Sequence, residues 1–365
     1  MTVPFDAARP EEGALGVYGA VGDALAGRPK GFGRRRAALA ARFARHRAVE
    51  ADAVAASWYA GLLAEAGHVC VVVPAGADER RRTLALADAP LYGARIIAAI
   101  PGIPAHAGDV VRWHREHDDG TGFPDRLRWD GIPPDAAALG IVDAFLAAIE
   151  DPLEPCGPAE ALFAIIGENG RRFNVELVRA FREFVTQGGA EDEARAETIE
   201  GSFDDTALLA SLAEKLDERA TRTTGRSGRV AALARALASH VGADAEHAAR
   251  LGHLTALGNA VTEPSEEAFD PLSRFARDRR AAAAQHASEL LGEVGAYAAD
   301  GELLVRAAEW HADRGPDLLA GIVGLAFTVD SMDPHDAPRL VAAASGKYFD
   351  PAVAEAYVAG VGAPT

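Results

Sequence analysis

Apolar residues recur at helical spacing along most of the chain, in segments that are rich in alanine. Only residues 69–73 (VCVVV) form a continuous apolar run of the kind that is typical of a buried strand. No uninterrupted run of 18 apolar residues occurs, which argues against a transmembrane helix. The pattern therefore predicts an all-α fold without a membrane span.

The composition narrows the classes of function. The 365 residues favour about two domains. With 37 Lys and Arg against 54 Asp and Glu, the net charge of −17 disfavours binding to nucleic acid or to anionic membranes. Two cysteines make no disulfide framework, and residues 1–10 do not read as a secretory signal, so we expect a cytoplasmic protein.

An acidic segment separates two parts of the chain. Residues 188–205 (GGAEDEARAETIEGSFDD) contain seven acidic residues, one arginine and few large apolar side chains. Such a composition is typical of a linker. We therefore predict a first domain over 1–187 and a second over 206–365.

The two parts resemble each other in the order of their motifs. Asp23 and Asp217 each stand twelve residues before an arginine that opens an amphipathic stretch. Further pairs follow in the same order: 113–116 with 310–313 (Trp-His-x-acid), 142–143 with 329–330 (Val-Asp), and 169–181 with 345–357. In the last pair, Asn174 or Asp350 is suited to cap a closing helix. The order predicts a tandem duplication of one helical domain.

The segment 114–124 (HREHDDGTGFP) carries the sharpest candidate chemistry. Its imidazole and carboxylate groups are suited to bind a metal, and its glycines let a phosphate approach the backbone. The alternative interpretation is a helix stop and a tight turn, in which Asp119 caps and the glycines supply positive φ angles. The residues alone leave both open.

This segment, with Ile132-Pro133 and residues 141–143 downstream, resembles the second half of an HD-GYP domain, a branch of the HD metal-dependent phosphohydrolases. The closing element 345–351 (SGKYFDP) is also similar to that family, and the resemblance covers roughly 15–185 and 208–358. It implies two helical bundles. It also implies hydrolysis of cyclic dinucleotides, notably cyclic di-GMP, at a centre of two or three iron or manganese ions.

The sequence departs from that family at most metal-ligand positions. In the first half the positions of the family's ligands hold Phe32, Ala64-Glu65, His68, Ala89-Pro90 and Arg115. In the second half they hold Arg226, Thr255-Ala256, Asn259 and Ala283, and the Gly-x-Gly-aromatic-Pro turn is missing. The family residues that remain are His114, Glu116, Asp119, Gly120, Gly122, Phe123, Pro124 and Asp143, with His311, Asp313 and Asp330 in the second half.

The leading hypothesis is a catalytically degenerate module that binds a nucleotide or a signalling protein, with no metal. Its expected contacts to a cyclic dinucleotide or a protein partner are Arg115, Glu116, Asp119, Gly120, Gly122, Phe123 and Pro124. Such a chain is expected to be a monomer with internal pseudo-symmetry or a homodimer.

Two further hypotheses stay open. One is a metal-dependent phosphohydrolase or cyclic di-GMP phosphodiesterase in which Glu65, His114 and Asp143 hold iron or manganese. A rebuilt mononuclear site of this kind would draw on His68, His106, Glu116 and His117 as well. The other is a sensor in which an arginine clamps a phosphate, with Arg34, Arg36, Arg80 and Arg115 as candidates.

Overall fold

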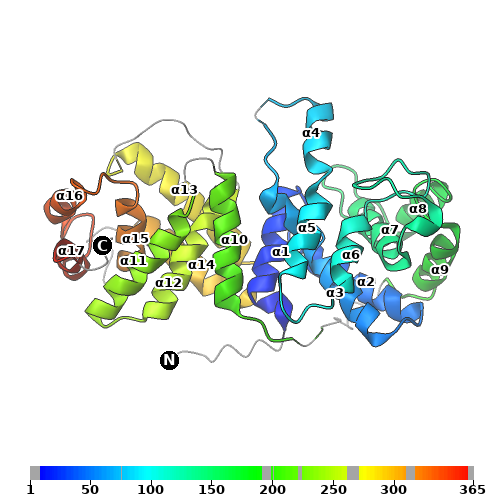
Figure 1. Ribbon diagram of the computed structural model, residues 1–365, viewed down its shortest axis with the longest axis horizontal. Coiled ribbons are helices and arrows are strands. Elements are labelled where there is room, and N and C mark those ends of the chain that lie inside the picture. The colour runs from blue at the N-terminus through cyan, green and yellow to red at the C-terminus, as the bar shows by residue number, and fades with distance from the viewer. Residues whose placement is uncertain are drawn as a thin grey trace. The chain divides into compact units, whose positions relative to one another are not determined.

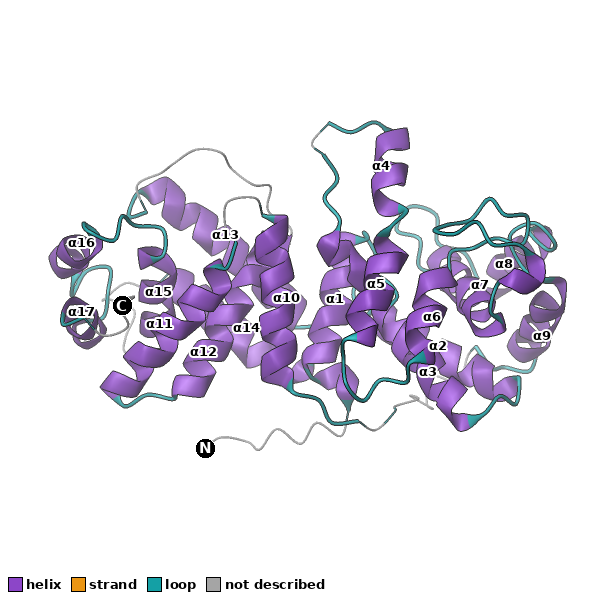
Figure 2. Cartoon of the chain, in the orientation of Figure 1, coloured by secondary structure: helices purple, strands orange, loops and turns teal. Residues whose placement is uncertain are grey.

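The computed structural model describes residues 9–74, 76–190, 199, 201–220, 224–260, 271–309 and 317–360. All regular secondary structure in these ranges is helical, as Figure 2 shows, which confirms the predicted all-α fold. The strand expected at 69–73 is wrong: Val69 and Cys70 end a short 3-10 helix, and Val71 continues as extended loop. No helix in the described ranges has the length and apolar character needed to cross a membrane.

The chain divides into two compact units, Met1–Phe203 and Asp204–Thr365. Their boundary falls inside the predicted linker 188–205, of which residues 191–198 and 200 lie outside the described residues. Phe203 packs edge-on against Tyr59 with 5.9 Å between ring centroids, so the end of this segment belongs to the packing of unit 1. Asp204 caps the first helix of unit 2 by accepting a hydrogen bond from the Ala207 N–H group.

Unit 1 runs from blue to green in Figure 1. Its α-helices, as far as the structure describes them, are α1 (Ala14–Leu25), α2 (Phe32–His46), α3 (Ala51–Leu63), α4 (Glu79–Leu86), α5 (Ala89–Ala98), α6 (His106–Trp113), α7 (Pro134–Ile149), α8 (Pro158–Gly167) and α9 (Val175–Thr186). Its 3-10 helices are η1 (Pro10–Glu12), η2 (Ala66–Cys70) and η3 (Trp129–Gly131). Helix α4 buries none of its residues and projects from the rest of the unit (Figure 1).

Packing in unit 1 places α2, α3 and α7 around one buried centre. Phe43 of α2 and Phe145 of α7 both lie edge-on against Phe181 of α9, at 5.0 and 5.1 Å between centroids. At Gly61, helix α3 approaches α2 so closely that a Cβ atom would lie 2.6 Å from the Ala37 Cα atom. Only glycine permits this crossing. It also brings the Gly61 carbonyl oxygen to within 2.7 Å of the Arg36 Nε atom.

Unit 2 consists of helices as well. Its described α-helices are α10 (Asp205–Arg219), α11 (Arg226–Val241), α12 (Ala245–Leu254), α13 (Arg274–Leu291), α14 (Ala298–Ala308), α15 (Leu318–Val329), α16 (Ala337–Ala344) and α17 (Pro351–Val358). Its 3-10 helices are η4 (Thr255–Ala260) and η5 (Gly295–Tyr297). Helices α11 and α12 repeat the close crossing of unit 1, because a Cβ atom on Gly252 would lie 2.5 Å from the Ala231 Cα atom.

The start of the second bundle helix has the same local structure in both units. Gly31 precedes α2 with φ of 69°, and Gly225 precedes α11 with φ of 68°. In unit 1 the Asp23 carboxylate accepts the Gly33 N–H group at 2.7 Å. In unit 2 the Asp217 carboxylate accepts the Ser227 N–H group, also at 2.7 Å. Asp23 and Asp217, which correspond in the sequence, therefore both accept a backbone N–H group at the start of the second helix of their unit.

The closing helices also begin alike. Isolated bridges join residues 169 and 173 before α9 and residues 345 and 349 before α17. Asn174 accepts hydrogen bonds from two N–H groups in the first turn of α9, and Asp350 does the same for α17. Both predicted N-caps are confirmed.

Candidate functional site

A cavity of about 660 Å³ opens in unit 1 among the end of α1 and the loop after it, η2, α4, the segment after α6 and the middle of α7. Among the described residues on its wall are four arginines and one carboxylate, Asp143; the arginines are Arg28, Arg82, Arg115 and Arg172. His68, His114 and His117 line it too. Cationic side chains therefore outnumber acidic ones on this wall, although the whole chain is acidic.

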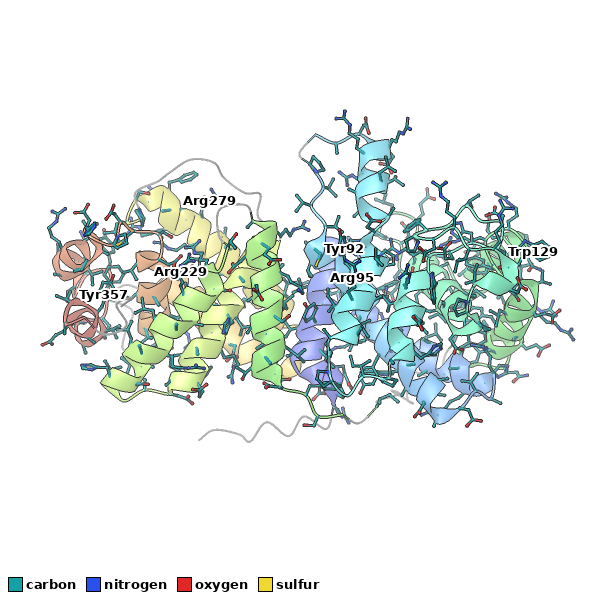
Figure 3. All side chains as sticks on the ribbon, viewed as in Figure 1. Tyr92, Arg95, Trp129, Arg229, Arg279 and Tyr357 are labelled. Carbon is teal, nitrogen blue, oxygen red and sulfur yellow. The ribbon has the colours of Figure 1, made fainter. Side chains whose placement is uncertain are left out.

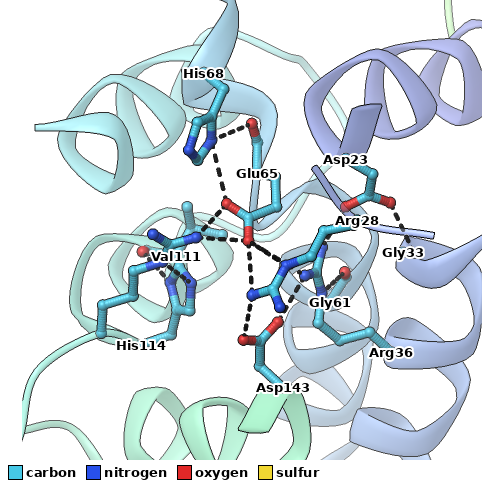
Figure 4. A network of polar contacts seen from close by, with 11 residues as sticks. Asp23, Arg28, Gly33, Arg36, Gly61, Glu65, His68, Val111, His114 and Asp143 are labelled. Atoms are coloured by element: carbon cyan, nitrogen blue, oxygen red, sulfur yellow. Dashed lines mark hydrogen bonds and ion pairs between the residues drawn. The ribbon is translucent and has the colours of Figure 1, made fainter. Parts of the chain in front are cut away.

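Glu65, which follows the end of α3, is buried beside this cavity and is held by cations. An oxygen of its carboxylate accepts a hydrogen bond from the Arg115 Nη2 atom at 2.6 Å and another from the Arg28 Nε atom at 3.2 Å. The His68 Nδ1 atom lies 3.2 Å from its second oxygen (Figure 4). Burial alone would raise the pKa of Glu65, but these neighbours, Arg115 foremost, hold it well below the usual range.

Asp143 projects from α7 toward two guanidinium groups (Figure 4). Its oxygens accept hydrogen bonds from the Arg28 Nη2 atom at 2.6 Å and the Arg36 Nη1 atom at 2.7 Å. Arg36 is fully buried and also donates to Asp23 at 3.1 Å. Burial opposes ionisation of Asp143, yet Arg36 and Arg28 lower its pKa below the ordinary value. Arg28 thus bridges Glu65 and Asp143, and the carboxylates are satisfied within the protein.

His114 follows the last residue of α6 and is buried. Its Nδ1–H group donates to the Val111 carbonyl oxygen at 2.7 Å, because a carbonyl can only accept. The Nε2 atom is left as an acceptor and faces the Arg115 Nε atom at 3.4 Å. Burial first, and then the charge of Arg115, lower the pKa of His114 to about 4. His114 is therefore neutral near pH 7, and its direct partner is a backbone carbonyl rather than Asp143.

The donor set does not fit an iron or manganese centre. Glu65, His114 and Asp143, the predicted metal ligands, are linked to one another through Arg28 and Arg115. However, guanidinium groups engage oxygens of both carboxylates, and a divalent cation would have to displace them and lie among like charges. Nowhere in the described ranges do three His, Cys, Asp or Glu side chains gather in a way that could hold a metal.

The other candidate ligands of a mononuclear metal site either lie away from the cavity or are hydrogen-bonded to other protein groups. The His106 Nε2 atom lies 2.9 Å from an oxygen of Asp135, at the start of α6, and His106 does not line the cavity. The ring of His117 bonds the Thr121 hydroxyl at 3.0 Å. The Glu116 carboxylate accepts N–H groups of residues 125 and 127 at 2.6 and 2.9 Å, so Glu116 braces the turn that follows it.

The structure of residues 119–124 agrees in part with the interpretation as a helix stop followed by a tight turn. Asp119 accepts the Thr121 N–H group at 2.9 Å, and Gly120 has φ of 76°. Gly122 has a different reason, because its backbone lies against residues 115–117 where a Cβ atom would clash. Among the expected contacts in this turn, Phe123 reaches the cavity wall, and Pro124 is not part of that wall.

The arginines proposed for a phosphate clamp divide into two groups. Arg115 lines the cavity, and Arg36 is buried behind Asp143. Arg34 donates to the Glu11 carbonyl oxygen at 2.8 Å, and neither Arg34 nor Arg80 is part of the wall. The sequence analysis missed Arg28, Arg82 and Arg172. Arg28 meets an acid 115 positions away, so no local pattern marks it; Arg172 lies in one of the paired motifs, which is a usable signal.

In unit 2 the retained acid is also held by arginines. Arg229 of α11, labelled in Figure 3, donates to Asp330 at 2.7 Å. The Arg226 Nε atom lies 3.4 Å from the same carboxylate. The remaining family residues of this half, His311 and Asp313, lie outside the described residues.

Comparison with known proteins agrees with this fold. Residues 21–177 match the family model described as an HD domain. No curated protein matches the chain. Among solved structures, the chain is similar to a cyclic GMP-AMP specific phosphodiesterase of V. cholerae, with a TM-score of 0.69 and 14% identity. The match covers 96% of this chain and 98% of that one. At this identity the likeness concerns the fold.

Proposed function

We propose that this chain, whose first unit carries an HD domain, binds phosphate groups of a cyclic dinucleotide in the arginine-lined cavity and does not hydrolyse them. The observation that carries the proposal is that guanidinium groups engage oxygens of both buried carboxylates, Glu65 and Asp143. Arg28, Arg36 and Arg115 supply positive charge beside Glu65 and Asp143. A module of this kind is a signalling receptor or scaffold rather than an enzyme.

Two arginines on the wall are available to a ligand. Arg82 and Arg172 are exposed, and neither forms an ion pair or a side-chain hydrogen bond with a residue that the structure describes. The Arg172 guanidinium lies over the Phe173 ring at 4.8 Å. Arginine suits phosphate because its planar fork donates two parallel hydrogen bonds. A volume of about 660 Å³ is within the range of pockets that hold nucleotide-sized ligands.

Calorimetric titration of the full chain with cyclic di-GMP and cyclic GMP-AMP tests this proposal. We expect binding that weakens as ionic strength rises, and a loss of about tenfold or more in affinity for Arg172→Met and for Arg82→Met. The matched control is Arg171→Met, which removes a neighbouring exposed arginine that is not part of the wall. Absence of binding, or equal loss in the control, would overturn the proposal.

The rival function is a phosphohydrolase, which the HD match favours. It predicts stoichiometric iron or manganese in the purified protein and turnover that disappears in His114→Ala and Asp143→Ala but persists in His106→Ala. We expect neither metal nor turnover, because guanidinium groups engage the carboxylates. Metal analysis combined with a phosphodiesterase assay in added Mn²⁺ separates the two functions.

We also propose that the two units are degenerate copies of one HD-GYP-like domain. The paired aspartates, the paired positive-φ glycines and the paired helix caps support this origin, since each pair makes the same backbone contact. The close helix crossings at Gly61 and Gly252 add a further pair. A crystal structure in which the helices of unit 1 do not superimpose on those of unit 2 in the same order would contradict it.

A further inference from the structure

Unit 2 contains a second cavity with an arginine-rich wall. It measures about 330 Å³ and lies between α13, the end of α14, α15 and the loop before α17. Helix α13 contributes Arg277 and Arg280, one turn apart on the side that faces the cavity. The half-exposed ring of Tyr348 forms part of the wall, and the Arg277 guanidinium lies 4.9 Å from the centre of that ring.

Arginines outnumber acids on the wall of this cavity, with Arg274, Arg277 and Arg280 against Asp278 and Glu309. The Arg280 Nη1 atom donates to the Pro271 carbonyl oxygen at 2.8 Å, and Arg280 forms no ion pair within the described part of the chain. Of the nearby acids, Asp278 pairs with exposed Arg274 at 3.7 Å. Asp330 is engaged by Arg226 and Arg229.

The field at Arg280 is therefore that of a cationic cluster. Burial first, and then Arg226 and Arg277, lower the pKa of Arg280 to about 10. The Arg277 Nε atom is buried without a hydrogen-bond partner among the described residues. A hydrogen bond and the charge of Lys347, and less strongly the charge of Arg277, lower the pKa of the Tyr348 hydroxyl. A buried donor and like-charge repulsion both cost free energy that an anion would recover.

We propose that the cavity lined by Arg277, Arg280 and Tyr348 binds the phosphate group of a small phosphorylated ligand, independently of the cavity in unit 1. The guanidinium groups supply charge-assisted donors for the phosphate oxygens. Tyr348 supplies an aromatic edge for whatever carries the phosphate. The volume is half that of the unit 1 cavity, which favours a phosphomonoester over a cyclic dinucleotide.

Titration of the full chain with inorganic phosphate and with AMP, followed by ³¹P NMR and calorimetry, tests this site. We expect a loss of about tenfold or more in affinity for Arg277→Met and for Arg280→Met, and a smaller loss for Arg280→Lys. Arg235→Met is the matched control, because Arg235 is an exposed arginine of the same unit paired with Glu246. Tighter binding of AMP than of phosphate identifies a nucleotide-type ligand, and equal binding identifies the phosphate group alone.

The outcomes also separate this site from that of unit 1. Arg172→Met should leave phosphate binding at the unit 2 cavity unchanged, whereas cyclic dinucleotide binding should survive Arg280→Met. Equal affinity in wild type and Arg280→Met, or equal loss in Arg235→Met, would overturn the inference.

A thermal readout covers the case in which a variant is unstable. We expect phosphate to raise the melting temperature of the wild type more than NaCl of equal ionic strength does, and Arg280→Met to abolish that difference. Without phosphate, Arg280→Met should melt about 2–4 °C higher, because it removes a buried charge from a positive field. A lower melting temperature in the variant, with no phosphate effect in the wild type, would show that the arginines serve the fold instead.

Discussion

The two units place arginines around the same helix start but balance them differently. In unit 1, Arg28, Arg36 and Arg115 meet two buried carboxylates, Glu65 and Asp143. In unit 2, the position that the sequence pairs with Glu65 holds Ala256, which is buried and apolar. Asp330 remains there, and its arginine partners come from the first turn of α11. The units thus share a backbone plan while their polar interiors differ.

The two networks have different consequences for stability and for binding. Where both acids remain, guanidinium groups pair with them, and the network becomes part of the fold. In unit 2, where Ala256 stands at one of these positions, Arg280 donates to a backbone carbonyl oxygen in the described structure. An external anion is then the natural partner. In unit 1, mutation of the network should therefore reduce stability strongly. In unit 2, mutation of the arginines should mainly reduce anion binding.

The strongest test of this comparison replaces the matched acids. We expect Asp143→Asn to destabilise unit 1 by about 3–5 kcal/mol, because it leaves the fully buried Arg36 with Asp23 as its nearest acid. Asp330→Asn should cost about 1–2 kcal/mol, since the Arg229 side chain is 59% exposed and water can solvate it. Hydrogen exchange in peptides from α7 and α15 measures the two local stabilities. Equal losses would remove the distinction between the two networks.

The second test uses acid. The pKa of His114 in the folded state is about 4, below its value of 6.5 in an unfolded chain. Burial raises the pKa of Asp23 to about 7, which acts in the opposite direction. Below pH 6.5 the unfolded chain nevertheless binds a proton at His114 that the folded chain does not, so His114 lowers stability as pH falls toward 4. The loss amounts to about 3 kcal/mol at pH 4. The acids Glu65 and Asp143 have lowered pKa values, so their contribution is lost only below about pH 4.

Urea unfolding between pH 7 and pH 4 measures this slope. His114→Asn keeps a donor for the Val111 carbonyl oxygen and removes the titrating ring, so the variant should lose less stability than the wild type between pH 7 and pH 4.5. His240→Asn, which replaces an exposed histidine of unit 2, is the control and should leave the slope unchanged. An unchanged slope in His114→Asn would show that another group accounts for the acid sensitivity.

Local features of this fold could be read from the sequence because they depend on nearby residues. Helical periodicity, the caps Asn174 and Asp350, and the turn at Asp119 each involve contacts within a few positions. The run at 69–73 was misleading, because β-branched composition alone does not create a strand partner. Val69 and Val71 are buried against helices, whereas Val72 is exposed.

The site could be foreseen only in outline. The sequence placed Glu65, His114 and Asp143 together through family resemblance. It did not show that Arg28 would bridge two of them, because Glu65 lies 37 positions and Asp143 lies 115 positions from Arg28. Ion pairs across such separations follow from the packing of α2, α3 and α7, and no local pattern encodes them. Of the exposed arginines of the wall, Arg172 lies in a paired motif that carries a signal, whereas Arg82 does not.

The smallest expected effect concerns what the units have in common. Asn174→Ala and Asp350→Ala each remove a side chain that accepts two N–H groups at the start of a closing helix. Loss of such a cap costs about 1 kcal/mol. Because both caps follow the same bridged turn, we expect similar losses of hydrogen-exchange protection in α9 and α17, and unchanged ligand binding in both cavities. A loss confined to one helix would mean that the two caps contribute differently to stability although their backbone geometry is the same. The similarity between the units would then be one of geometry and not of energy.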